Sequence, residues 1–295
     1  MKSIETRVET KNGRSLRVTE SGDPHGLPVL ILHGSPGSGT LYPPHAQAAL
    51  ARRIRLIGYD RPGYGGSTPD PGRNVAAAAS DAEALADHLG IDRFAVVGES
   101  GGGPPALACG ALLPRRVIAV ASLASPAPYG SPGLDFTAGM GAANVEEIQT
   151  TLRGGPEYEQ AAAAQIEGMR QSTPEQMRAT FSTLLSPVDT EALSGDVESF
   201  LFSTMQEGLR SGGRGYIDDD LAGVHPWGFD LSKIRTRASV WHGRQDRFVP
   251  FSHGVWLSEN IPRAEPHLFD AEGHISLIAR KTPDALAWIV AQTPR

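Results

Sequence analysis

The sequence predicts an α/β protein with a doubly wound, mostly parallel sheet and helices on both faces. Short and mostly apolar segments recur along the 295 residues, which is typical of central strands that are covered on both sides. Helical stretches separate several of these segments, and such alternation indicates a parallel sheet. With 40% hydrophobic and 20% charged residues, the composition is that of an ordinary globular protein.

An antiparallel hairpin is expected first. Residues 4–9 and 14–20 alternate apolar and polar side chains on either side of the turn at 11–13, as paired edge strands do. Apolar runs predict the remaining strands at 28–32, 54–58, 94–97, 117–121, 238–241 and 266–269. Helices are predicted at 75–89, over the small-residue stretch 101–113 and after residue 274.

The alternation breaks between Tyr129 and Asp230. This segment contains helical patches at 157–170 and 174–185 but no convincing strand. Because a loop region of about a hundred residues inside a compact domain is usually functional, we interpret it as a lid or cap. The chain is therefore divided into a first core segment (1–128), a helical cap (129–230) and a second core segment (231–295).

Gly98-Glu99-Ser100-Gly101-Gly102 lies where an apolar strand ends and a helix begins. A strand, a one-residue turn and a helix together form the geometry of a nucleophile elbow. The sharp turn strains its central residue, and Cβ atoms on the neighbours would collide with the strand or the helix. Ser100 is therefore the candidate nucleophile. Glu99 has two open interpretations, since its side chain could point beneath the sheet or into the pocket.

A serine nucleophile needs a base and an orienting carboxylate, both from loops at the carboxyl ends of strands. Asp246 follows one predicted strand, and His274 follows the last strand on a Gly-His turn. Asp270 is a rival carboxylate, but its position just before His274 indicates a strand end. The other histidines are assigned to structural positions at strands (His33, His242, His267) or to packing and surface positions (His25, His45, His88, His225, His253).

Five motifs follow one another along the chain: His33-Gly34-Ser35-Pro36-Gly37, Tyr59 to Ser67, Gly98 to Gly102, Gly243 to Pro250, and Gly273-His274. In this order they resemble the α/β-hydrolase fold superfamily over nearly the whole chain. The resemblance implies the α/β-hydrolase fold, a Ser100-Asp246-His274 triad, and an oxyanion hole made by the backbone N–H groups of Ser35 and Gly101. It also implies that the segment from Tyr59 to Ser67 is a structural turn.

The same resemblance implies a serine hydrolase that cleaves a carboxylic ester of a small or medium substrate through an acyl-enzyme. Such a reaction requires no metal or organic cofactor. A proline-iminopeptidase-like aminopeptidase is the second interpretation, because its loop and helical cap are similar. Its usual elbow (Gly-Gly-Ser-Trp-Gly) and turn (Asp-Gln-Arg-Gly) differ from those found here. C–C hydrolases or lyases, biosynthetic cyclases and non-catalytic receptors on the same fold are further alternatives.

The cap is expected to determine specificity. Its acids could bind a free amine or form a solvated helix face: Glu146, Glu147, Glu157, Glu159 and Glu167. Its large apolar side chains could line a pocket or pack between the helices and the sheet: Phe136, Met140, Phe181, Phe202, Met205, Tyr216 and Trp227.

Composition excludes several classes of protein. A net charge of -6, with no run of Lys or Arg, argues against a nucleic-acid partner and leaves a small-molecule substrate. Cys109 is the single cysteine, which excludes an intrachain disulfide and indicates core packing. The N-terminus lacks the apolar core of a signal peptide and no stretch has the length of a membrane span, so we expect a cytoplasmic protein without a membrane partner.

Overall fold

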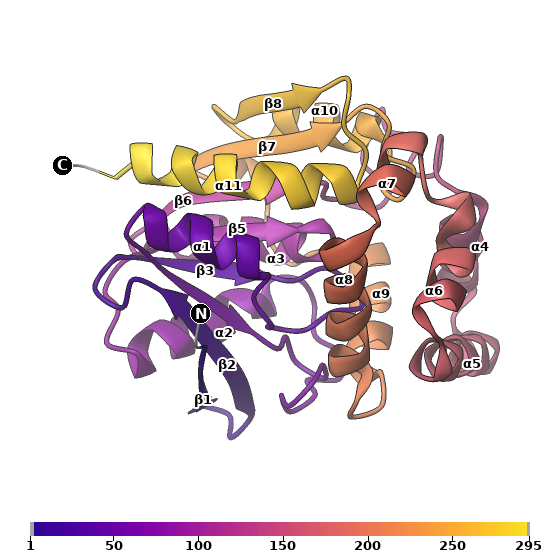
Figure 1. Cartoon of the computed structure of the whole chain (residues 1–295), viewed down its shortest axis with the longest axis horizontal. Coiled ribbons are helices and arrows are strands. Elements are labelled where there is room, and N and C mark those ends of the chain that lie inside the picture. Colours follow the sequence, from indigo (N-terminus) through magenta and orange to yellow (C-terminus); the bar gives the residue numbers. More distant parts are fainter. Residues whose placement is uncertain (1–2, 294–295) are drawn as a thin grey trace.

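Eight strands form one sheet in the computed structural model, which describes residues 3–293 (Figure 1). Their order across the sheet is β1-β2-β4-β3-β5-β6-β7-β8. Strands β3 to β8 run parallel, whereas β2 is antiparallel to both β1 and β4. The bounds are β1 Ile4–Glu9, β2 Ser15–Gly22, β3 Leu27–Leu32, β4 Ile54–Tyr59, β5 Phe94–Glu99, β6 Val117–Leu123, β7 Arg237–Gly243 and β8 Glu265–Phe269. The predicted hairpin and parallel strands are confirmed.

Helices cover both faces of the sheet, as the predicted fold class requires. Helices α1 (Pro43–Ala51) and α11 (Ile275–Ala291) pack on one apolar cluster. Helices α2 (Ala77–His88), α3 (Gly103–Leu112) and α10 (Phe251–Asn260) pack on the other, where Cys109 is buried. The sequence pattern did not indicate α1 or α10. Between residues 3 and 293, no helix combines the length and apolar character needed to cross a bilayer.

Helices gather beyond the carboxyl ends of the strands, at the right of Figure 1. They are α4 (Ala142–Arg153), α5 (Gly155–Gln171), α6 (Pro174–Thr180), η2 (Phe181–Thr183), α7 (Pro187–Ala192), α8 (Gly195–Leu209) and α9 (Arg214–Val224), and all of them lie between β6 and β7. These helices are called the cap below. The helix expected over 174–185 is interrupted, because α6 ends at Thr180 and continues only as a 3-10 turn. Residues Thr180, Phe181, Ser182 and Thr183 all have modest intrinsic helix propensity, which weakens the helix at this point. The division at 129 and 230 stays a prediction.

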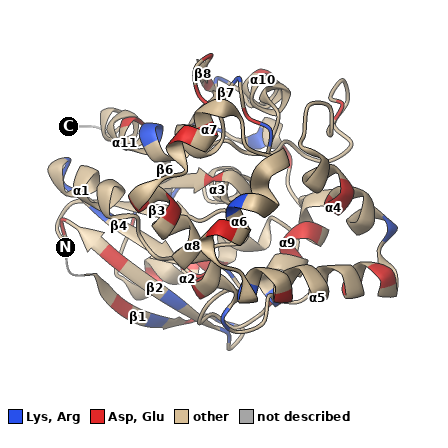
Figure 2. Ribbon diagram, turned by 45° about the vertical axis from the view of Figure 1, so that its right-hand side comes forward, with Lys and Arg blue, Asp and Glu red and all other residues tan. Residues whose placement is uncertain are grey.

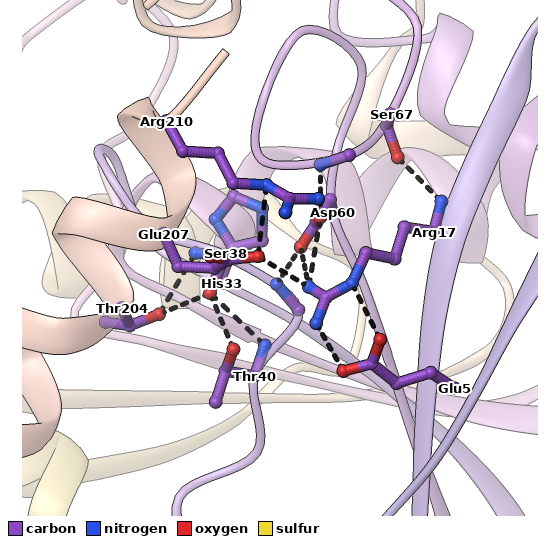
Figure 3. Close-up of polar contacts among 12 residues, drawn as sticks. Glu5, Arg17, His33, Ser38, Thr40, Asp60, Ser67, Thr204, Glu207 and Arg210 are labelled. Carbon is purple, nitrogen blue, oxygen red and sulfur yellow. Dashed lines mark hydrogen bonds and ion pairs between the residues drawn. The ribbon is translucent and has the colours of Figure 1, made fainter.

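Polar contacts tie helix α8 to the edge of the sheet (Figure 3). The Arg17 guanidinium of β2 lies 3.3 Å from an Asp60 carboxylate oxygen and 3.2 Å from a Glu207 oxygen of α8. Asp60 also accepts hydrogen bonds from the backbone N–H groups of Gly39 and Gly66, at 2.7 and 2.8 Å. Asp60 therefore holds the turn together, and Arg17 connects that turn to the cap.

Candidate active site

Ser100 is the first residue of the 3-10 turn η1 (Ser100–Gly102), which connects β5 to α3. Its φ of +53° lies in the left-handed region, which costs a non-glycine residue about 1–3 kcal/mol. Glycine neighbours relieve the crowding: a Cβ on Gly98 would lie 2.7 Å from the Cβ of Ala106, and one on Gly102 would lie 2.7 Å from the carbonyl oxygen of His33. The strained turn expected from the sequence is present.

His274 and Asp246 lie next to Ser100 although they come from distant parts of the chain. His274 Nε2 is 3.0 Å from the Ser100 hydroxyl oxygen, and His274 Nδ1 is 2.8 Å from Asp246 Oδ2. The other Asp246 oxygen accepts hydrogen bonds from the backbone N–H groups of Phe248 and Val249, at 2.9 and 2.8 Å. These bonds orient Asp246 so that His274 Nδ1 donates to it and Nε2 is free to accept from Ser100.

Electrostatics favour an ionised Asp246. Burial alone would raise the pKa of Asp246, but the interactions with His274 and His242 lower it to about 2. Burial alone would lower the pKa of His274, and the Asp246 carboxylate more than offsets that effect, so the His274 pKa is raised. The pair therefore stabilises the imidazolium that forms when His274 takes a proton.

The rival residues lie elsewhere or make structural contacts. The Asp270 side chain is 83% exposed and pairs with Arg244, away from His274. His33 Nδ1 donates to the Gly34 carbonyl at 2.7 Å, and its Nε2 accepts from the Arg61 N–H at 3.1 Å. His242 donates to the Val249 carbonyl at 2.8 Å. His267 stacks on Trp241 with ring centroids 3.8 Å apart.

The two proposed oxyanion donors are close neighbours. A Cβ on Gly101 would lie 3.3 Å from the Ser35 backbone nitrogen, and one on Gly34 would lie 3.7 Å from the Ser100 hydroxyl oxygen. The loop that carries Ser35 therefore runs beside Ser100, the candidate nucleophile. Gly101 belongs to the first turn that leads into α3, where backbone N–H groups have no helical partner and the helix dipole favours negative charge.

A buried ionic network holds the Ser35 loop, and the sequence analysis did not anticipate it. Asp219 of α9 accepts a 2.6 Å hydrogen bond from the Ser35 hydroxyl and pairs at 2.6 Å with both Arg61 and Arg73. The Tyr64 hydroxyl also donates to Asp219, at 2.7 Å. Burial would raise the pKa of Asp219, but Arg61 and Arg73 lower it to about 2. Arg61 thus does more than complete a turn, since it connects the Ser35 loop to the cap.

Asp189 of α7 holds the loop that carries His274, and no sequence pattern predicted this role. Its two carboxylate oxygens accept hydrogen bonds from the backbone N–H groups of His274 and Ser276, each at 3.0 Å. The residue is fully buried and Ser186 donates to it as well. A lone aspartate in a helical insertion has no local sequence signature, and only the spatial proximity reveals this contact.

Glu99 lines a cavity and also contacts a helix of the core. Its Oε1 accepts a 2.8 Å hydrogen bond from the Thr282 hydroxyl of α11 and lies 3.6 Å from His45 Nδ1. Burial raises the pKa of Glu99 to about 7, although Thr282 and His274 act in the opposite direction. Burial lowers the pKa of His45 to about 4, so the imidazole is neutral at pH 7.

Two chambers meet at Ser100 and share Ser35, Ser100 and Phe248. A wider space between the cap helices, about 800 Å³, also reaches these three residues. The α9 chamber, about 210 Å³, is defined by Ala78, Pro104, Glu147, Asp220, Gly223 and Trp227. The α8 chamber, about 170 Å³, is defined by Tyr42, Glu99, Val197, Leu201, Met205 and Ile278. Of the predicted pocket residues, Phe136, Met140 and Trp227 line the first chamber, Phe181 and Met205 line the second, and Tyr216 lines a further space between cap helices. Phe202 packs in the apolar cluster of the cap instead.

The cap acids separate into two groups. Glu147 of α4 lines the α9 chamber together with Asp220 of α9, and Figure 2 shows acidic positions on both helices. The other four acids named from the sequence are exposed on the surface: Glu146, Glu157, Glu159 and Glu167. Only Glu147 among the five is therefore placed to meet a substrate.

Comparison with known proteins identifies the family. The alpha/beta hydrolase fold family matches residues 28–280. The chain is 39% identical to a probable proline iminopeptidase of Leptolyngbya boryana over 102 residues, about a third of each chain (34% and 32%). It is 27% identical to a 2-hydroxy-6-oxo-6-phenylhexa-2,4-dienoate hydrolase of Burkholderia cepacia over 90% of this chain and 88% of the other. An esterase from Exiguobacterium antarcticum superposes with a TM-score of 0.73 at 22% identity, over 98% and 100% of the chains. The protein belongs to the alpha/beta hydrolase fold family and is a hydrolase.

Proposed function

We propose that this hydrolase cleaves carboxylic esters through an acyl-enzyme on Ser100. The observation that carries the proposal is the hydrogen-bonded series Asp246–His274–Ser100, with distances of 2.8 and 3.0 Å. In the first step the Ser100 oxygen attacks the ester carbonyl carbon while His274 Nε2 takes the hydroxyl proton. Asp246 holds the imidazole in the required tautomer and stabilises its positive charge.

The tetrahedral intermediate carries a negative oxygen, which the Ser35 and Gly101 N–H groups are proposed to bind. One such donor typically contributes about 2.7–4 kcal/mol of transition-state stabilisation. Collapse of the intermediate breaks the bond to the alcohol oxygen, which takes the proton from His274. A water molecule then attacks the acyl-serine with His274 as base, releasing the acid and restoring Ser100.

The direct test is hydrolysis of a p-nitrophenyl ester series by the wild type and by Ser100→Ala. We expect Ser100→Ala to lower kcat by about 10⁴-fold or more, as loss of a serine nucleophile does in other enzymes. Mass spectrometry of the quenched reaction should find the acyl group on the peptide that contains Ser100. Ester turnover that Ser100→Ala leaves unchanged would overturn the proposal.

A second candidate is cleavage of substrates whose acyl group carries a free amine, as in an aminopeptidase. Glu147 and Asp220 line the α9 chamber, and neither forms an ion pair with Lys or Arg in the part of the chain that the structure describes. Burial, and for Asp220 also the Glu147 charge, raises the pKa of each carboxyl. The Tyr216 and Tyr158 hydroxyls donate to Glu147 and Asp220, respectively. An ammonium group bound between the two carboxylates would offset their repulsion.

Aminoacyl p-nitroanilides discriminate between the two candidates. If the aminopeptidase assignment holds, they exceed matched acyl esters in kcat/KM, and Glu147→Gln raises KM for the anilides by about tenfold or more. Glu146→Gln, on the exposed side of the same helix, is the control and should have no effect. Preference for esters with no response to Glu147→Gln rejects the second candidate.

A further inference from the structure

The two chambers differ in their relation to His274, and this difference orients the substrate. His274 lines the α8 chamber together with Ile275 and Ile278 at the start of α11. The residues that line the α9 chamber include Ser100 and Gly101 but not His274, within the described part of the chain. Phe248 stacks on the His274 ring, with centroids 4.7 Å apart, and borders both chambers.

The chemistry of acyl transfer requires the leaving oxygen to receive its proton from His274. The leaving group must therefore extend on the side of Ser100 where His274 is exposed to the cavity, which is the α8 chamber. The acyl substituent is attached to the same tetrahedral carbon but needs no contact with His274. Two spaces beside Ser100 lack His274 among their lining residues: the α9 chamber and the wider space between the cap helices. The acyl substituent is assigned to the α9 chamber, because only this chamber includes Gly101, the proposed oxyanion donor.

The α8 chamber is apolar and carries little charge. Its walls include Val197, Leu201 and Met205 of α8. Glu99 is the one Asp, Glu, Lys or Arg side chain among the described residues that line it, and it accepts from Thr282. The Thr204 hydroxyl pairs with Ser38 at 2.8 Å. Burial of an alkyl or aryl group against these side chains is favourable, because it removes apolar surface from water.

The α9 chamber has more charged side chains among its lining residues than the α8 chamber, although apolar residues also line it. Glu147, Asp220 and Arg73 contribute to its wall. Two further lining residues, Tyr59 and Trp227, are at least 96% buried, with exposed fractions of 0% and 4%. Their hydroxyl and indole N–H have no hydrogen-bond partner among the described residues. Buried polar groups without partners are costly, so a ligand that supplies acceptors here is favoured.

We propose that the substrate is an ester of a polar acyl group with an apolar alcohol or phenol, the acyl group occupying the α9 chamber and the alcohol the α8 chamber. This inference rests on the proposed acyl-enzyme mechanism and adds to it the substrate class and the direction of binding.

One lining residue of each chamber can be enlarged to test the assignment. Gly223 of α9 lines the α9 chamber, and a Cβ added there meets no atom within 4 Å, so the first side-chain carbon of Gly223→Leu is accommodated without a clash. Val197→Phe enlarges a side chain on the wall of the α8 chamber. Neither residue belongs to the proposed catalytic groups, and hydrolysis of methyl acetate provides the internal reference for both variants.

Four esters test the assignment: methyl acetate, methyl heptanoate, hexyl acetate and methyl 6-hydroxyhexanoate. Val197→Phe should lower kcat/KM for hexyl acetate about tenfold or more relative to methyl acetate, and should leave kcat/KM for methyl heptanoate relative to methyl acetate unchanged. Gly223→Leu should lower the relative kcat/KM for methyl heptanoate and leave that for hexyl acetate unchanged. The wild type should prefer the 6-hydroxyhexanoyl over the isosteric heptanoyl ester by about tenfold or more. The proposal is overturned if Val197→Phe impairs hydrolysis of methyl heptanoate while Gly223→Leu impairs hydrolysis of hexyl acetate. It is also overturned if the wild type prefers the heptanoyl ester.

A measurement that needs no turnover separates this proposal from the mechanism on which it rests. Inactivation by p-nitrophenyl alkylphosphonates places the P–alkyl group on the acyl side of Ser100. Gly223→Leu should slow inactivation by the hexyl compound at least tenfold relative to the methyl compound, and Val197→Phe should not. If no phosphonate or ester reacts with Ser100, the acyl-enzyme mechanism itself fails. If both react but the variants respond in the exchanged sense, only the chamber assignment fails.

Discussion

Asp189, on a helix of the cap, accepts a hydrogen bond from the backbone N–H of His274 at 3.0 Å. Through its second oxygen it also accepts from Ser276, the second residue of α11. The loop that carries the proposed base is thus held from one side by the core and from the other by the cap.

Asp189→Ala should therefore impair the reaction without contacting the substrate. Two buried N–H groups lose their acceptors, at about 1–3 kcal/mol each in unfolding free energy, and the His274 ring loses its fixed position. We expect kcat to fall about tenfold or more with a smaller change in KM, and Tm to fall. Asp189→Asn keeps one acceptor and should recover part of kcat.

Glu191→Ala on the same helix is the matched control, because Glu191 is exposed and no such contact is expected to be lost. Circular dichroism verifies folding of each variant. An unchanged kcat in Asp189→Ala, despite a lowered Tm, would show that the contact serves stability alone.

Asp219 should position the loop that carries Ser35 as Asp189 positions the loop that carries His274. It joins the Ser35 hydroxyl to Arg61 and Arg73. Asp219→Asn removes the charge that compensates two buried guanidinium groups, and breaking a buried ion pair of this kind costs about 3–5 kcal/mol of stability. Where the protein stays folded, affinity for a trifluoromethyl ketone, which mimics the tetrahedral oxyanion, should fall more than affinity for a substrate-like ketone. Equal losses for both ligands would contradict the prediction.

Ser100, Asp246 and His274 could be predicted from the sequence because the patterns that indicate them are local. Ser100 lies among glycines directly after an apolar strand, and Asp246 and His274 each follow a strand on a turn, so a few neighbouring residues indicate each position. The structure brings the three together as the motif order implies.

Asp189 and Asp219 could not be predicted in this way. Their partners are 85 and 184 residues distant along the chain, and no periodicity or motif surrounds them. The same holds for the two chambers, because Glu99 and Glu147 become pocket residues only through packing of the cap on the sheet.

Activity should decline at acid pH with an apparent pKa set by His274. The imidazole must be neutral to accept the Ser100 proton, and the Asp246 carboxylate raises its pKa above 6.5 against the effect of burial. The acid limb of kcat/KM should therefore lie above pH 6.5 in the wild type. Asp246→Asn removes the negative charge, so its residual activity should show a limb at lower pH. An unshifted limb would assign the titration to another group.

Acid should also destabilise the fold through buried neutral histidines. Burial and the Arg61 charge lower the pKa of His33 to about 3, and burial lowers the pKa of His253 to about 4. In each ring one nitrogen accepts a backbone N–H, from Arg61 or from Ala127, and protonation would break that bond. Because the unfolded chain binds these protons near pH 6.5 and the folded protein does not, stability is complete above pH 6.5 and is lost as the pH falls.

Each of the two histidines should lower the unfolding free energy by about 1.4 kcal/mol per pH unit below pH 6.5, down to its folded pKa. His253→Asn isolates one contribution, since its side-chain oxygen can accept from Ala127 but does not titrate. Urea unfolding at intervals between pH 7 and pH 4.5 measures how the unfolding free energy changes with pH. Carboxyl groups with a raised pKa, such as Glu99, contribute equally to the variant and the wild type, so their contribution cancels in the comparison. The unfolding free energy of His253→Asn should fall less steeply with pH than that of the wild type, by about 1.4 kcal/mol per pH unit, which corresponds to one proton. This difference in slope should appear whatever stability the variant has lost at pH 7. Parallel slopes would show that His253 is protonated in the folded protein.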